Sequence, residues 1–214
     1  MRTETEKLII GKMKYVVQLI TGLFFLVQVV IAYLPSVLEN GLYEFELTFL
    51  SNSMMGMIFI IGGLTGIIKK RDLPHVIYMN CVVLLQIVFL ICMAFIKEFN
   101  FSGSFIFLHI VDPIIATIEV FLFCESRKKP TAITILSSLI FPMVYLTYAI
   151  IYGYVSGNWI YGIINIPDRG LGFVSCVVLG TALVIIGLTW LQYRIIKKKM
   201  LRSDIQKSRE GERQ

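Results

Sequence analysis

Six apolar stretches account for more than half of this 214-residue chain. Each is about 20 residues long, which is the length that an α-helix needs to cross the hydrocarbon core of a bilayer. The composition agrees with this pattern, because 57% of the residues are hydrophobic and soluble domains average roughly 45–50%. We therefore expect an all-α polytopic membrane protein, a bundle of six transmembrane helices. The predicted spans cover residues 15–34, 47–68, 76–96, 105–123, 132–154 and 171–193.

Lys and Arg residues are distributed unevenly between the two ends of these spans. The chain has 20 of them, and 18 fall on one side of the predicted path: four before the first span, three after the second, three after the fourth and eight after the sixth. Lys97 and Arg169 fall on the other side. Because cationic loops tend to remain on the cytoplasmic side, we expect both termini to be cytoplasmic, in a multi-pass protein of the plasma membrane.

The same pattern predicts the domain layout and the class of partner. We expect a cytoplasmic segment at 1–14, a transmembrane domain at 15–193 and a basic cytoplasmic tail at 194–214, which is polar enough to be disordered. The net charge of +6 lies in short loops beside spans, so we expect membrane lipid as a partner and no nucleic acid. No cofactor or metal is expected, because the cysteines form no C-x-x-C pair and read as small buried hydrophobes. They are Cys81, Cys92, Cys124 and Cys176.

Three ionisable residues, His109, Asp112 and Glu119, lie inside the fourth span. Successive residues of a helix advance by about 100°, which places these three on an arc of roughly 80°. Ionisable groups inside a membrane are costly and usually face a bundle interior or a wet cavity. Pro113 lacks the N–H that would bond the carbonyl of residue 109, and this predicts a kink beside the imidazole. The alternative interpretation is that the polar stripe only holds helices together.

The second span offers a partner for this stripe. Thr48, Ser51 and Asn52 follow the spacing i, i+3 and i+4 and therefore share one helix face. Thr48 and His109 each lie about 5 Å below the same predicted surface, so a hydroxyl and an imidazole are expected at matching depth. Such a pair is the start of a nucleophile–base arrangement. The alternative is that the hydroxyls bond to carbonyls of their own helix.

Four short motifs occur in order between the second and sixth spans. They are LTFLSN at 47–52, Leu108-His109 followed by Pro113 and Glu119, FPMVYLTY at 141–148, and NWIY at 158–161 leading to Pro167-Asp168 and Gly172. Together they resemble the bacterial six-span integral membrane proteins related to the eukaryotic androgen-induced-gene and androgen-dependent-regulator proteins. The eukaryotic members are threonine hydrolases of fatty-acid esters of hydroxy fatty acids. The resemblance implies that Thr48 is a nucleophile and that His109 is its base.

Three functions follow from these patterns. The first is an intramembrane threonine hydrolase that acts on lipid esters from the outer leaflet, with Ser51 or Asn52 donating to the oxyanion and Asp112 holding the His109 tautomer. Glu119 lies roughly 15 Å deeper and can act only at a distance. The second is a lipid or small-molecule carrier that uses the polar stripe of the fourth span, Glu119 included. The third is an assembly partner without chemistry, for which the glycine pair Gly62 and Gly66 suits close helix contact.

Overall fold

The computed structural model describes residues 4–40, 46–94, 103–123 and 131–211, with side chains placed at 13–35, 38, 46–94, 103–123 and 131–199. Every regular element in these ranges is helical. Six helices are long and apolar enough to cross a membrane, which confirms an all-α polytopic membrane protein. They cover Met13–Pro35, Leu47–Lys69, His75–Ala94, Ser104–Phe123, Ala132–Ser156 and Leu171–Lys199.

The helices group into two compact units, Met1–Cys124 and Glu125–Gln214. We expected one transmembrane domain over residues 15–193, and the structure instead divides it after the fourth span. Hydropathy marks the segments that enter a bilayer, but it carries no information about which of those segments pack together. The candidate residues Thr48, Ser51, Asn52, His109, Asp112 and Glu119 all belong to the first unit.

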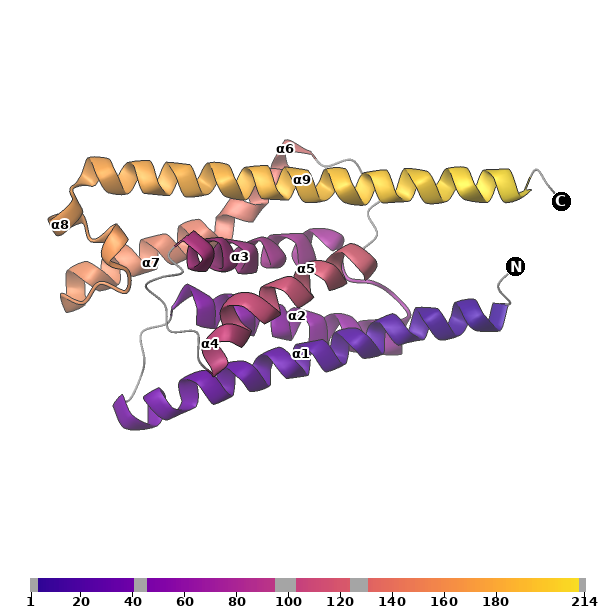
Figure 1. Ribbon diagram of the computed structural model, residues 1–214, viewed down its shortest axis with the longest axis horizontal. Helices are drawn as coiled ribbons and strands as arrows, with labels where there is room; N and C mark the ends of the chain where they lie inside the picture. Colours follow the sequence, from indigo (N-terminus) through magenta and orange to yellow (C-terminus); the bar gives the residue numbers. More distant parts are fainter. Residues whose placement is uncertain (1–3, 41–45, 95–102, 124–130, 212–214) are drawn as a thin grey trace. The chain divides into compact units, whose positions relative to one another are not determined.

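The first unit contains four spans (Figure 1), and the first and the third each contact both the second and the fourth. The first three are α1 (Glu4–Asn40), α2 (Leu47–Lys69) and α3 (His75–Ala94). The fourth consists of α4 (Ser104–Ile106), the π-helical turn η1 (Phe107–Val111) and α5 (Asp112–Phe123). α1 packs along α2 and touches α4 and η1, whereas α3 packs against both α2 and α5.

α1 and α2 approach closely because glycines line their contact. A Cβ at Gly22 would lie 2.6 Å from the Gly56 carbonyl oxygen, and a Cβ at Gly63 would lie 2.7 Å from the carbonyl oxygen of Tyr15. Gly66 faces the Tyr15 ring, and Gly62 faces the Tyr78 hydroxyl of α3. The glycine pair therefore serves packing within the chain. Small residues at helix contacts are typical of membrane bundles.

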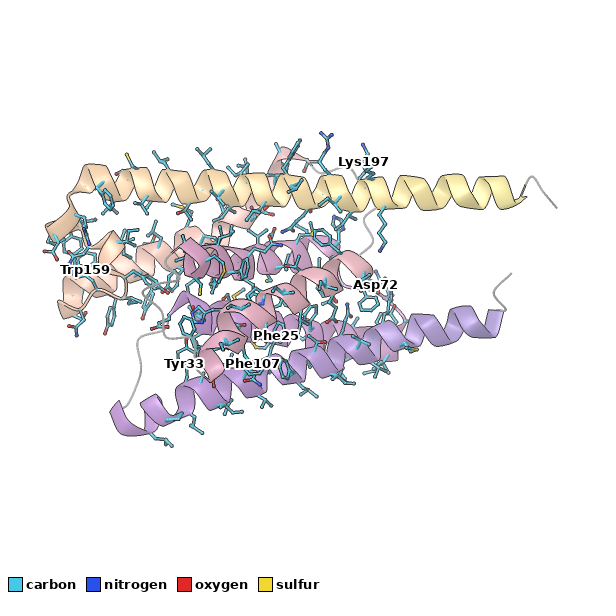
Figure 2. The ribbon with its side chains drawn as sticks, in the orientation of Figure 1. Phe25, Tyr33, Asp72, Phe107, Trp159 and Lys197 are labelled. Carbon is cyan, nitrogen blue, oxygen red and sulfur yellow. The ribbon has the colours of Figure 1, made fainter. Side chains whose placement is uncertain are left out.

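Aromatic rings fill the core beside this glycine contact. The rings of Phe25 and Phe59 lie 5.9 Å apart, and Phe59 lies 6.1 Å from Tyr78. Phe25 and Phe107 are labelled in Figure 2. Phe107 meets the edge of Phe24 at 6.0 Å, which fixes η1 against α1. The cysteines follow the expectation in part: Cys81 and Cys92 are buried, Cys176 is exposed, and Cys124 lies outside the described residues.

The second unit consists of the fifth and sixth spans and the segment that joins them. The fifth span combines α6 (Ala132–Leu136), η2 (Ser137–Leu139) and α7 (Ile140–Ser156). The joining segment holds η3 (Gly162–Ile164) and α8 (Ile166–Arg169), and the sixth span is α9 (Leu171–Gly211). Trp159, labelled in Figure 2, packs on Gly153 and lies 5.2 Å from the Tyr154 ring.

Two helices run further than the sequence predicts. α9 continues through Arg194 to Gly211, where we expected a disordered tail from residue 194. Lys, Arg, Gln, Glu and Leu are good helix formers, and a helix that has already nucleated adds such residues at little cost. α1 likewise includes Pro35 and ends at Asn40, beyond the predicted end at residue 34.

Candidate functional site

Thr48 and His109 meet across the bundle, as the matching depths predict. The Thr48 Oγ1 atom lies 3.2 Å from the Nε2 atom of His109. Thr48 is the second residue of α2, and His109 is the central residue of η1. Thr48 is buried and 5% exposed, whereas the His109 ring is partly exposed.

The direction of this hydrogen bond follows from the other ring nitrogen of His109. Its Nδ1 atom lies 3.0 Å from the Phe105 carbonyl oxygen. A carbonyl oxygen can only accept a hydrogen bond, so Nδ1 carries the proton and Nε2 of the neutral ring is an acceptor. The Thr48 hydroxyl then donates to Nε2. The Phe105 ring also stacks on His109, with centroids 3.9 Å apart and planes at 17°, which holds the imidazole in this orientation.

The π-helical turn explains how His109 is presented. In η1 the Asp112 N–H donates to the Phe107 carbonyl, five residues earlier, instead of to the Leu108 carbonyl four residues earlier. Pro113, which follows directly, cannot donate to the helix and its ring disturbs the preceding turn. The wider turn leaves the Leu108 carbonyl to accept the Asn52 side chain from α2, at 3.1 Å. π-Turns of this kind are frequent at functional sites.

Asn52 and Ser51 support the site, but not in the expected role. The Asn52 Nδ2 atom donates to the Leu108 carbonyl and to the Thr48 carbonyl, the latter at 2.9 Å. The Ser51 hydroxyl donates to the same Thr48 carbonyl at 3.2 Å. Their donors are thus engaged with backbone oxygens, and the expectation that either residue donates to an oxyanion does not fit this arrangement. Both side chains are fully buried and instead tie α2 to η1.

Asp112 and Glu119 are buried on the same helix, but neither touches His109. The acceptor on Nδ1 is the Phe105 carbonyl, so the expectation that Asp112 holds the tautomer is wrong. Neither carboxyl oxygen of Asp112 has a hydrogen-bond partner, and the same holds for Oε1 of Glu119. Glu119 interacts instead with the Thr21 hydroxyl of α1. The polar stripe of the fourth span therefore separates into His109, which pairs with Thr48 of α2, and two acids further along the helix.

Sequence reasoning missed two polar contacts of the fourth span. The Phe105 carbonyl orients His109, and its signal is the spacing of four residues on one helix. The second is the Gln86–Thr117 contact between α3 and α5, at 3.1 Å, in which Thr117 also donates to the Pro113 carbonyl at 2.7 Å. A glutamine within an apolar span is the signal that identifies this contact, because its amide must find a partner in the bundle.

The surroundings of the pair bear on what it can bind. At the same end of α1 and α2, Tyr33 donates to Glu46 at 3.1 Å, and its ring meets the edge of Phe49 at 5.0 Å. Tyr33 is labelled in Figure 2. Within the described part of the chain, no three His, Cys, Asp or Glu side chains lie close enough to hold a metal ion. The site is thus a hydroxyl and an imidazole in a setting of aromatic and aliphatic side chains.

Comparisons with known proteins add no family to this geometry. No protein-family model, no curated protein and no solved structure matches the chain.

Proposed function

We propose that this protein is an intramembrane threonine hydrolase that cleaves lipid esters of the fatty-acyl class. The observation that carries the proposal is the Thr48 Oγ1 to His109 Nε2 contact of 3.2 Å, with Nδ1 anchored on a carbonyl. A hydroxyl that donates to a neutral, oriented imidazole is the minimal nucleophile–base pair. The resemblance to the androgen-induced-gene superfamily, in which a Thr and a His of the same two spans are required, supports it.

The reaction has two steps. The Thr48 oxygen attacks the acyl carbonyl while its proton passes to Nε2 of His109, and the imidazolium then gives that proton to the departing alkoxide. This leaves the acyl group esterified to Thr48 and releases the alcohol. A water molecule, deprotonated by His109, attacks the acyl-threonine, releases the fatty acid and restores the hydroxyl. The Phe105 carbonyl stabilises the imidazolium in both steps by accepting from Nδ1.

The start of α2 supplies a donor for the oxyanion. The first N–H groups of a helix have no intrahelical acceptor, and the helix dipole places partial positive charge there. In α2 the Leu50 N–H donates back to the Glu46 carbonyl at 3.1 Å, and Thr48 precedes it within the first turn. We assign the oxyanion contact to the Thr48 backbone N–H, because a nucleophile's own amide lies within reach of the carbonyl oxygen that it attacks.

Hydrolysis assays test this function directly. The full chain in lipid nanodiscs is given fatty-acyl p-nitrophenyl esters, and initial rates are compared for wild type, Thr48→Ala and Thr147→Ala. Thr147 is an exposed threonine of α7 that donates to its own helix at Met143, so it controls for loss of a hydroxyl. We expect Thr48→Ala to lower kcat/KM by about 10³-fold or more and Thr147→Ala to leave it unchanged. Equal activity of the two variants would refute the hydrolase.

The charge pattern supports an orientation for this chemistry. We propose a plasma-membrane protein with both termini cytoplasmic, since 18 of 20 Lys and Arg residues then lie inside. Thr48 would lie near the outer leaflet, from which a lipid ester enters. In a cysteine-free background, Asn158→Cys should react with an impermeant maleimide in intact cells, and Lys199→Cys only after permeabilisation. The reverse pattern would place the site on the cytoplasmic side.

A carrier remains the second candidate, because two buried acids of the fourth span have unpartnered oxygens. In a carrier the depth of Glu119 matters, whereas ester hydrolysis does not require it. Flux of a small molecule or lipid into proteoliposomes should then depend on pH and fall in Glu119→Gln. Flux that is insensitive to this substitution, together with Thr48-dependent ester cleavage, would leave hydrolysis as the function.

A further inference from the structure

Asp112 is a buried acid without a counter-charge. Its side chain is 0% exposed, and both carboxyl oxygens lack a hydrogen-bond partner. An ionised carboxylate in such a place is strongly unfavourable unless it is paired. Carboxylates inside membrane bundles accordingly pair with a basic residue, bind an ion or hold a proton. The structure must therefore supply a positive charge to Asp112 from some source.

In the described part of the first unit, no basic side chain is paired with Asp112. The sequence holds no Lys or Arg between residues 15 and 68 or between 72 and 96, and none between 98 and 126. Lys14 pairs with Asp72 at 2.8 Å, outside the apolar part of the bundle. The imidazole of His109 is engaged by Thr48 and by the Phe105 carbonyl. Within these residues, a bound cation is what can balance the charge of Asp112.

The unpartnered amide oxygen of Asn52 indicates where this charge would lie. Asn52 is 0% exposed, its Nδ2 atom is held by two carbonyls, and its Oδ1 atom has no partner. One of those carbonyls belongs to Leu108, one turn before Asp112 on the same side of the helix. The amide oxygen and the carboxyl group thus share one stretch of the bundle. All of their unpartnered atoms are acceptors, which is the ligand set of a hard cation.

The other titratable groups around this stretch are few. On its own helix Asp112 has His109 before it and Glu119 two turns after it. The Gln86–Thr117 contact sets the register of α3 on α5 and brings the buried thiol of Cys92 to the level of Asp112. In α1 and α2, residues 16–32 and 47–68 carry no ionisable side chain. The local charge is that of one carboxylate.

We propose that Asp112 and the Asn52 Oδ1 atom bind one monovalent cation, a proton or a sodium ion, in the interior of the first unit. A single charge matches a single carboxylate, whereas a divalent ion would leave one buried charge uncompensated. A proton on Asp112 turns one of its carboxyl oxygens into a hydrogen-bond donor. A sodium ion would instead be coordinated by the carboxyl oxygens of Asp112 and the amide oxygen of Asn52. Cation binding at Asp112 is independent of ester hydrolysis at Thr48.

Thermal unfolding of the full chain in detergent separates the two sources. In the first arm, at about pH 8 and constant ionic strength, the sodium concentration is raised from about 1 to 100 mM in exchange for choline. If sodium binds, the Tm rises by roughly 3–5 °C for each tenfold increase in sodium concentration above Kd. Without sodium, lowering the pH to about 5.5 raises Tm if the folded form holds a proton that the unfolded chain releases. Both arms are run in Glu119→Gln, which lacks the other buried acid, and there the added Asp112→Asn substitution should abolish the sodium response and reduce the pH response. No response of Glu119→Gln in either arm, or an equal response with and without Asp112→Asn, overturns the site.

Infrared spectroscopy decides the question if Asp112→Asn does not fold. In Glu119→Gln, Asp112 is the one buried acid among the described residues. A proton at the site gives the carbonyl band of a protonated carboxylic acid in sodium-free buffer, and a sodium ion gives a carboxylate band that shifts when choline replaces sodium. A spectrum with neither the acid band nor a sodium-sensitive carboxylate band overturns the proposal.

Discussion

Polar side chains inside the spans find their hydrogen-bond partners in different places in the two units. In the second unit, hydroxyls donate to the carbonyl three or four residues earlier on their own helix, at 2.7–2.9 Å; these residues are Ser137, Ser138, Thr147, Ser156 and Thr189. In the first unit, Thr48, Asn52 and Gln86 reach across to the fourth span. Bonding to the own helix is the default of Ser and Thr in spans, and Ser51 and Thr117 of the first unit follow it. Thr48 departs from this default, and its contact with His109 marks the candidate site.

The glycines show the same contrast. Gly22 and Gly63 of the first unit have no room for a side chain, because a neighbouring backbone lies where the Cβ would be. In α9, an added Cβ at Gly180 or Gly187 meets nothing within 4 Å. Close backbone contact between α1 and α2 is therefore a feature of the first unit that α9 does not share at these two glycines.

The largest expected effect is on catalysis by His109. His109→Ala removes the base but leaves Thr48 in place, so we expect kcat/KM for acyl esters to fall by about 10²–10⁴-fold. The comparison variant is Gln192→Ala, which removes a buried polar side chain of α9 and should leave catalysis within a few fold. Ester hydrolysis by His109→Ala within about threefold of wild type would show that the bridging contact is structural.

The next effect is on packing. Gly22→Ala forces a Cβ against the Gly56 carbonyl and the Ile60 backbone, and overpacking of this kind costs about 1–3 kcal/mol. Gly180→Ala has open space and should be neutral or gain about 0.5–1 kcal/mol, the ordinary preference of a helix for alanine over glycine. Unfolding of both variants by SDS titration measures the difference. Equal stabilities would contradict the close contact of α1 with α2.

Asn52 should have a comparable effect on stability and a clear effect on activity. Asn52→Leu removes the donor from the Leu108 and Thr48 carbonyls, and a buried acceptor left without a partner costs about 1–3 kcal/mol. Because the amide ties α2 to η1, we also expect weaker hydrolysis through misplacement of Thr48. Thr189→Val, which removes an own-helix bond, should change stability by less than about 1 kcal/mol. A larger effect at Thr189 than at Asn52 would reverse the comparison between the units.

The smallest effect belongs to Gln86 and Thr117. A double-mutant cycle with Gln86→Leu and Thr117→Val should give a coupling energy of about 0.6 kcal/mol, the average for hydrogen bonds between membrane helices. Thr117→Val also removes the hydrogen bond from Thr117 to the Pro113 carbonyl. This loss occurs in the single and in the double variant, so it cancels in the coupling energy between Gln86 and Thr117. A coupling energy of zero would mean that α3 and α5 are held by apolar contacts alone.

The sequence predicts the spans well because hydropathy and helix length act along the chain, with little influence from neighbours. The depth rule also brought Thr48 and His109 together, since residue number translates directly into distance along a straight helix. The role of Asp112 was assigned by analogy with a triad, and the Phe105 carbonyl, four residues before His109, occupies the Nδ1 atom instead. Ser51 and Asn52 were expected to donate to an oxyanion, and in the structure the Thr48 and Leu108 carbonyls accept from them.

Two features of the fold lay beyond the sequence for similar reasons. The boundary between the two units depends on which apolar faces pack together, and all six faces look alike in composition. The helical continuation from Arg194 to Gly211 depends on propagation from an existing helix, whereas the charge of that segment, taken alone, predicts disorder. Local composition therefore identified the membrane segments, but not how they pack together or how far the last helix continues.

Mapping of a covalent adduct tests the central claim most directly. The full chain in nanodiscs is treated with a fluorophosphonate that carries a fatty-acyl-like tail, and the modified residue is located by mass spectrometry. We predict one adduct, on the peptide that contains Thr48, and its loss in His109→Ala, because the hydroxyl is activated by the imidazole 3.2 Å away. An adduct on another residue, or an unmodified Thr48 in wild type, would contradict the account.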